Sequence, residues 1–176
     1  MNRRICILSL TTIALLTGCG AKENPDSTQE KITTIFSTPY KAECIATVKS
    51  DKTENTYSYT SESNSDGTWS LDYGDFRLST DFENATAERG GEKITSRAAE
   101  GELVLSPSYF FKNYLSGGDI ENTDDGYMLT CDIKENKFNR CTAEMEIAEN
   151  FVPRRMSIKD KDGKQIINIE IVKFSR

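Results

Sequence analysis

Most of this chain alternates between apolar and polar residues with a period of two, and this pattern limits its fold more than any other feature. The alternation is clearest from Tyr40 to Val48, where every second residue is apolar and most residues between are charged or polar. Neighbouring side chains of a strand point to opposite faces, so the pattern predicts a sheet with one covered face. Residues 61–67 predict a turn. Other segments of this kind are 57–59, 69–73, 76–78, 92–97, 127–133, 141–147, 156–158 and 167–171.

One segment between the predicted strands has helical signals instead. Ser106 is a good N-cap, Pro107 stands at the first helical position, and Gly117-Gly118 ends the helix. We expect a helix from Ser106 to Leu115 whose apolar side must cover an apolar surface. That side is formed by Phe110, Phe111, Tyr114 and Leu115.

A second helix is expected from Ser27 to Phe36. Ile32, Ile35 and Phe36 share one side of it, and Pro39 follows its end. One curved antiparallel sheet, an incomplete barrel whose inner face is covered by the two helices, buries all these apolar faces together. The predicted fold class is therefore α+β.

The N-terminal residues form a secretory signal. Residues 1–4 carry two arginines, and the apolar run at 5–16 is too short to cross a bilayer as a helix. The following Leu16-Thr17-Gly18-Cys19 resembles the bacterial lipobox, which implies cleavage before Cys19 and diacylation of its thiol. The alternative is an ordinary secretory signal with a chance cysteine. Two acyl chains hold a protein stably on a membrane.

The expected organisation is a lipoprotein signal peptide at 1–18, a lipidated cysteine and flexible tether at 19–30, and one domain at 31–176. Removing the signal takes away Arg3 and Arg4, so the formal charge changes from −6 to −8. A chain this acidic is not expected to bind nucleic acid, because proteins that bind nucleic acid carry basic surfaces. The expected location is the extracytoplasmic side of the cell membrane, reached through the lipid anchor.

The composition argues against catalysis. The chain contains no histidine, which excludes His-based triads and His-ligated metal sites. The acidic pairs Asp72/Asp75, Asp119/Glu121 and Asp124/Asp125 stand beside Gly or Asn, and we expect solvated acids in turns there. We therefore expect a protein that is not an enzyme and that holds no metal or cofactor.

Three cysteines follow Cys19. If strands 127–133 and 140–147 form a hairpin about Glu135-Asn136-Lys137, Cys131 and Cys141 become direct cross-strand neighbours on the covered face. The two cysteines could then either form a disulfide or remain a pair of buried thiols, and the sequence leaves both alternatives open. Cys44 is expected to be a buried core thiol rather than a reactive one.

The order of these elements resembles a known family. A helix, many strands, a Pro-capped aromatic helix and four final strands occur over residues 30–176, with the stretches 151–158, Asp162-Gly163-Lys164 and 169–174 near the end. This arrangement is similar to the LolA/LolB fold of lipoprotein carriers. Because the chain carries its own anchor signal, it also resembles the GerS-type germination lipoproteins of Gram-positive spore formers, and no partner-contact residue can be matched.

The resemblance implies a membrane-anchored, non-enzymatic lipoprotein that binds a protein partner, such as a cell-wall or cortex hydrolase, in spore germination. The alternative is a carrier of lipid or lipoprotein. A carrier needs an empty apolar cavity between sheet and helices, whereas a docking protein can fill that space with its own side chains. An enzyme that acts on wall glycan through two carboxylates is the least supported function.

Overall fold

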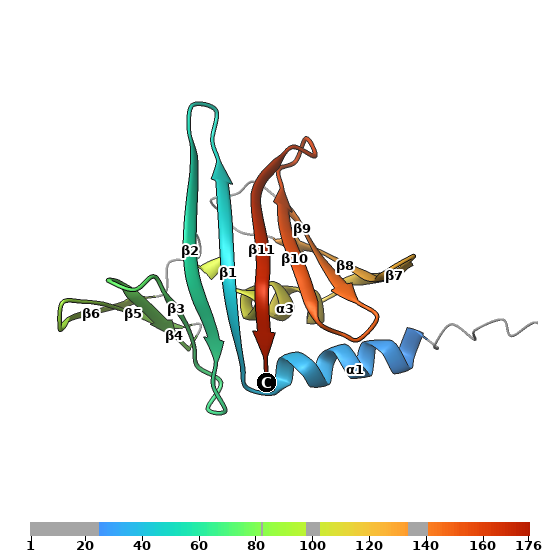
Figure 1. Cartoon of the computed structure of the whole chain (residues 1–176), viewed down its shortest axis with the longest axis horizontal. Helices are drawn as coiled ribbons and strands as arrows, with labels where there is room; N and C mark the ends of the chain where they lie inside the picture. Colours follow the sequence, from blue (N-terminus) through green and yellow to red (C-terminus); the bar gives the residue numbers. More distant parts are fainter. Residues whose placement is uncertain (1–24, 82, 98–102, 134–140) are drawn as a thin grey trace, which may run out of the picture.

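All the strands belong to one open antiparallel sheet (Figure 1). The computed structural model describes residues 25–81, 83–97, 103–133 and 141–176, and within these ranges the sheet has 11 strands in the order β6-β5-β4-β3-β2-β1-β11-β10-β9-β8-β7. This confirms the predicted curved sheet that does not close. The elements are α1 (Pro25–Ser37), β1 (Tyr40–Lys49), β2 (Glu54–Ser63), β3 (Trp69–Asp72), β4 (Arg77–Thr80), β5 (Asn84–Arg89), β6 (Glu92–Arg97), α3 (Pro107–Leu115), β7 (Asp119–Thr123), β8 (Gly126–Ile133), β9 (Cys141–Ala148), β10 (Pro153–Lys159) and β11 (Gln165–Ser175).

The two halves of the chain meet in the middle of the sheet. β1 pairs with β11, so the first and last strands are neighbours, while β6 and β7 form the two outer edges. The chain passes from one edge to the other through α3, which lies behind β1 and β11 in Figure 1. We call the face toward α3 the inner face and the opposite one the outer face.

α3 begins as the sequence predicts. Ser106 has extended backbone angles, and the backbone N–H of Ser108 donates to its Oγ at 3.1 Å, so Ser106 is the N-cap. Phe110, Phe111 and Tyr114 are buried. The prediction for Leu115 is wrong, because its side chain is 53% exposed. Consecutive helical residues point about 100° apart, which turns Leu115 away from the side that carries Tyr114.

α1 packs on the inner side of the sheet near the end of β11. Ile32, Ile35 and Phe36 are buried as expected, and the Phe36 ring stacks on that of Phe111 with 4.7 Å between centroids. The helix begins at Pro25 rather than Ser27, and Thr28 is buried. Residues 25–30, which the sequence predicts to be part of the tether, thus belong to this helix. None of the helices in the described ranges is long and apolar enough to cross a membrane.

The inner face of β1 is buried as the alternation predicts, and two strands were not expected. β5 and β7 are short and consist mainly of alanine and polar residues, so neither has a strong apolar alternation. The backbone of β5 is held in the sheet by its neighbours β4 and β6, and that of β7 is held by β8. β2 also runs to Ser63, further than predicted, and the turn after it is shorter.

Candidate functional site

Large buried side chains of the described residues pack against the inner face of the sheet. Trp69 and Phe110 are 1% exposed, and Tyr114 is 2% exposed. The rings of Phe110 and Tyr114 stack with 6.3 Å between centroids, and that of Phe111 lies 5.9 Å from Tyr114. These rings therefore pack closely together between the sheet and α3. Further members of the same buried cluster include Leu71, Leu78, Leu129, Met145, Met156 and Ile169.

Buried hydroxyl groups join the start of α3 to the centre of the sheet. The hydroxyls of Tyr40 and Ser108 are 2.6 Å apart, and the Tyr59 hydroxyl donates to the carbonyl of Leu105 at 2.6 Å. Burial raises the pKa of both tyrosines, so the phenols are neutral and serve as hydrogen-bonding groups. The network is structural, because it fixes the position of α3 against β1 and β2.

The three cysteines in the described ranges, Cys44, Cys131 and Cys141, are buried. Burial raises the pKa of Cys44 from 9.0 to about 12. Burial, with a smaller contribution from Asp132, also raises the pKa of Cys131 to about 12, and burial raises the pKa of Cys141. Thiols of this kind stay protonated at neutral pH and are poor nucleophiles. This agrees with the expectation for Cys44.

The expected register of the hairpin that carries Cys131 and Cys141 is wrong. Cys131 lies opposite Ala143, and Cys141 lies opposite Ile133. The two thiols are thus diagonal neighbours, about 7–8 Å apart at Cα, beyond the usual span of about 4.4–6.8 Å for a disulfide. The shift of two residues keeps both cysteines on the inner face, so the alternation alone could not show it.

Other predicted positions lie outside the described residues or play structural roles. Cys19 and the turn at Glu135-Asn136-Lys137 fall outside the described ranges. Asp119 and Glu121 are exposed residues of β7, so the turn expected there is wrong. Within the described chain, no group of three or more Cys, Asp or Glu residues is arranged to hold a metal ion.

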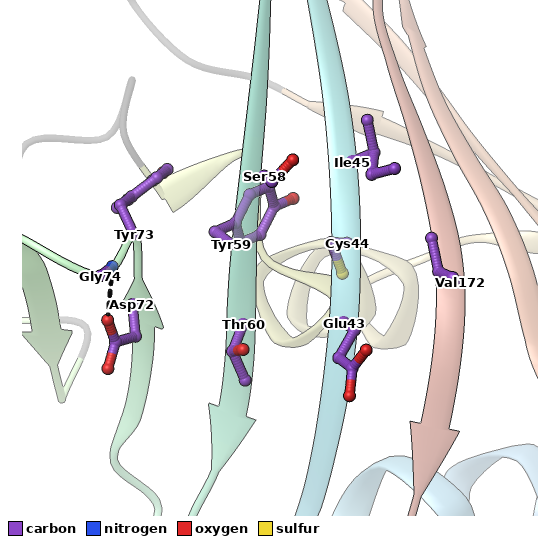
Figure 2. A pocket seen from close by; sticks show the side chains of 10 residues that line it. All are labelled: Glu43, Cys44, Ile45, Ser58, Tyr59, Thr60, Asp72, Tyr73, Gly74 and Val172. Carbon is purple, nitrogen blue, oxygen red and sulfur yellow. Dashed lines mark hydrogen bonds between the residues drawn. The ribbon is translucent and has the colours of Figure 1, made fainter.

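The outer face has a hollow of about 430 Å³ over the middle of the sheet. β1 contributes Glu43 and Ile45 to its wall, and β11 contributes Val172 (Figure 2). The far wall is the turn after β3, where the backbone N–H of Gly74 donates to the Asp72 carboxylate at 2.8 Å. The hollow is also lined by Cys44, Ser58, Tyr59, Thr60 and Tyr73.

Two apolar side chains at this hollow face solvent. Ile45 is 37% exposed and Val172 is 58% exposed. The pairing of β1 with β11 shifts by one residue between Glu43 and Cys44, and this bulge adds Val172 to β11 without a partner on β1. Charged groups surround the pair, and Lys173 Nζ lies 3.3 Å from Glu43 Oε1. Sequence reasoning missed this site, although Ile45 was a signal because it is apolar at an outward position.

The hollow adjoins a stretch of strand with a free backbone edge. β3 pairs only with residues 60–63 of β2, so in the described chain the residues from Glu54 to Tyr59 are paired with β1 alone. This part of β2 projects beyond β3 in Figure 1. A hollow of mixed lining with two exposed apolar side chains, beside a strand edge that is unpaired in the described chain, suits a protein ligand better than a small molecule.

The sequence matches no family model and no curated protein. Among solved structures, the chain is similar to one in the complex of the CwlD amidase with the GerS lipoprotein from Clostridioides difficile. That match has 13% identity and a TM-score of 0.53, and it covers 88% of this chain and 97% of the other. At this identity the likeness shows a shared fold and nothing more.

Two further similar structures are those of an uncharacterised conserved protein and a named superfamily member. The first, from Thermus thermophilus, matches with 10% identity and a TM-score of 0.52 over 86% of both chains. The LolA superfamily protein NE2245 from Nitrosomonas europaea matches with 10% identity and a TM-score of 0.48, over 88% of this chain and 94% of its own. At these identities the likeness concerns the fold alone, and the open, curved antiparallel sheet with two helices that the sequence predicts is confirmed by the structure itself.

Proposed function

We propose that this LolA-like protein is a non-enzymatic, membrane-anchored lipoprotein that binds another exported protein through the hollow on its outer face. The observation that carries the proposal is the contrast between the two faces. On the inner face, where a carrier would hold acyl chains, the large side chains of Trp69, Phe110 and Tyr114 are buried. The outer face exposes Ile45 and Val172 beside the part of β2 that, among the described residues, pairs with β1 alone.

The chemistry of the outer hollow fits a protein surface with basic residues around an apolar centre. Protein interfaces place apolar side chains at the centre and charged ones at the rim. Ile45 and Val172 supply such a centre, and the Glu43 and Asp72 carboxylates stand beside it. The formal charge of the chain is −6, so a basic partner would also be attracted from a distance.

A cell-wall hydrolase is the partner class we propose, with spore germination and cortex modification as the process. Support comes from the structure in which the CwlD amidase is bound to the GerS lipoprotein, because a chain of that complex has the fold described here. Diacylation of Cys19 would hold the docking domain near a membrane, where an exported wall enzyme can be bound. Deleting the gene should then block germination and leave lipoprotein sorting intact.

Binding measurements with variants of the hollow test this proposal. The full mature chain is titrated with the cortex amidases of its own bacterium, and Val172→Arg is compared with Val172→Thr. Arginine introduces bulk and positive charge at the centre, and we expect a loss of at least about tenfold in affinity, as for a central interface residue. Threonine keeps the branched shape, and its affinity should stay within about threefold of the parent's, under about 0.7 kcal/mol.

A matched control lies on the same face of the sheet, away from the hollow. Thr142→Arg on β9 makes the same kind of change at a half-buried outward position, and it should bind like the parent. Equal affinity for the Val172→Arg and Thr142→Arg variants would refute docking at the hollow. If no wall hydrolase binds and the purified chain extracts lipids or lipoproteins from membranes, the carrier alternative is correct.

A further inference from the structure

A row of apolar side chains runs across the inner face of the sheet to its edge strand β6, where the last side chain of the row is exposed to solvent. On the inner face, Leu71 of β3 lies opposite Leu78 of β4, Leu78 opposite Ala87 of β5, and Ala87 opposite Ile94 of β6. Leu71 and Leu78 are buried, Ala87 is partly buried, and Ile94 is 71% exposed. Ile94 has the highest exposure among the exposed large apolar side chains of the described residues. The row therefore lacks a cover at its outer end.

The backbone of β6 is also open on its outer side. In the described part of the chain, β6 pairs only with β5, and the pairing is continuous without a bulge from Arg89↔Glu92 to Asn84↔Arg97. Gly90 and Gly91 both have positive φ, of 59° and 85°, as a two-residue hairpin turn requires. Such a turn is closed by a hydrogen-bonded pair, here Arg89 and Glu92, and the pattern alternates from there. Lys93 and Thr95 consequently direct their N–H and C=O groups to the open edge.

We propose that β6 pairs antiparallel with β6 of a second copy of this chain, with Ile94 opposite Ile94. A two-fold axis perpendicular to the sheet keeps the inner faces of both copies on the same side, and this allows only registers in which a residue lies opposite one an even number of positions away. In the proposed register Lys93 and Thr95 lie opposite each other and exchange backbone hydrogen bonds. Ile94 then meets its own symmetry mate on the inner face, and the apolar row continues into the second sheet.

The neighbouring registers are disfavoured by charge. Moving the axis by one residue in one direction places Lys93 opposite Lys93, and moving it in the other direction places Lys93 opposite Arg97. The proposed register instead opposes Glu92 to Ser96 and Lys93 to Thr95, so no like charges face each other. The ammonium group of Lys93 also lies 3.1 Å from the Glu88 carboxylate within its own hairpin. Two short strands bury little area, so the dimer is expected to be weak in solution and favoured when many copies share one surface.

Cysteine crosslinking tests both the pairing and its register. Residues opposite each other in a non-hydrogen-bonded pair have Cα atoms about 4.5 Å apart, which lies within disulfide range. The full mature chain with Ile94→Cys should therefore form a covalent dimer on mild oxidation, and most of it should be crosslinked at high concentration. The buried native thiols with raised pKa keep the background of the parent chain low. Ser96→Cys is the matched control on the same face, and it should stay at the parent's level because each Ser96 lies opposite a Glu92.

A backbone change separates edge pairing from random collision of exposed cysteines. Thr95→Pro removes an N–H that points away from β5, so the β5–β6 hairpin keeps its hydrogen bonds while the second copy loses one and meets the proline ring. Adding Thr95→Pro to Ile94→Cys should return crosslinking to the parent's level, and sedimentation should show a concentration-dependent dimer for the parent alone. A parent that stays monomeric at about 100 µM, a concentration at which even a dimer of micromolar Kd would be largely formed, together with Ile94→Cys no more crosslinked than Ser96→Cys, would overturn the proposal. Crosslinking by Thr95→Cys instead of Ile94→Cys would refute the register.

Discussion

Replacing Phe110 with alanine should lower the free energy of unfolding by about 4 kcal/mol, within the range of about 3–5 kcal/mol for a fully buried ring. Phe110 is 1% exposed, and its ring stacks on Tyr114 at an interplanar angle of 11°. The lost aromatic pair contributes about 0.5–1.5 kcal/mol of this total. The loss should not fall to the lower end of the range because α3 cannot move to close the cavity. Its start is fixed by the Ser106 cap and by the hydrogen bond between Tyr40 and Ser108.

The same helix supplies the control. Leu115 is 53% exposed, so Leu115→Ala should change the free energy of unfolding by less than about 0.5 kcal/mol. Urea unfolding can be followed through Trp69, which is the only tryptophan and is 1% exposed. A loss of 4 kcal/mol should lower the midpoint by about 2 M urea, given slopes of about 2 kcal/mol/M, and should lower the Tm by about 8–16 °C.

The comparison of these two variants decides whether the inner face is filled. If Phe110→Ala unfolds at the same urea concentration as Leu115→Ala, the Phe110 ring is not packed between α3 and the sheet. The inner face would then have room for a ligand, and the argument against a carrier would fail.

Three further predictions concern the core, the pH dependence and the anchor. Tyr114→Phe should leave stability unchanged or raise it by up to about 1 kcal/mol in urea unfolding, because the buried Tyr114 hydroxyl has no hydrogen-bond partner in the described structure; a loss of more than 1 kcal/mol would show a hidden partner. Thermal melts should show a Tm that falls as the pH rises above 9, because the raised pKa values of Cys44 and Cys131 make the folded chain hold protons that the unfolded chain releases; a Tm that rises there would contradict the burial of these thiols. Cell fractionation should find Cys19→Ala released from the membrane and Cys6→Ala retained, and retention of the Cys19 variant would exclude the lipid anchor.

The elements that were predictable are those whose signals are local. The N-cap at Ser106 and the alternation in β1 depend on residues a few positions apart, and both were confirmed. β5 and β7 were missed because their composition has little strand preference and neighbouring strands hold them in place. The exposure of Leu115 depends on the rotation of α3 about its axis, and the partner of Cys131 depends on a shift of two residues in the hairpin register. The periodic pattern distinguishes neither of these.

The site was less predictable than the fold, because its residues come from segments far apart in the chain. Ile45 was visible as an apolar residue at an outward position, but the bulge that exposes Val172 exists only where β1 meets β11. Likewise, the turn at Asp72 becomes a wall only because β3 pairs with β2 for a short distance.

The sequence by itself determined most of the strands, the apolar side of those strands, and where the aromatic helix begins, since these depend on side-chain size, polarity and backbone preference along the chain. The tertiary structure decided the order of the strands, the pairing of the first with the last, and which outward residues gather into a hollow. Hydrogen bonds between strands form equally well with many partners, and the choice among them depends on how the whole inner face can be buried at once. For the same reason, Ile94 appears in the sequence as one more apolar residue of an alternating strand, and only its place on the outer edge leaves it exposed to a partner.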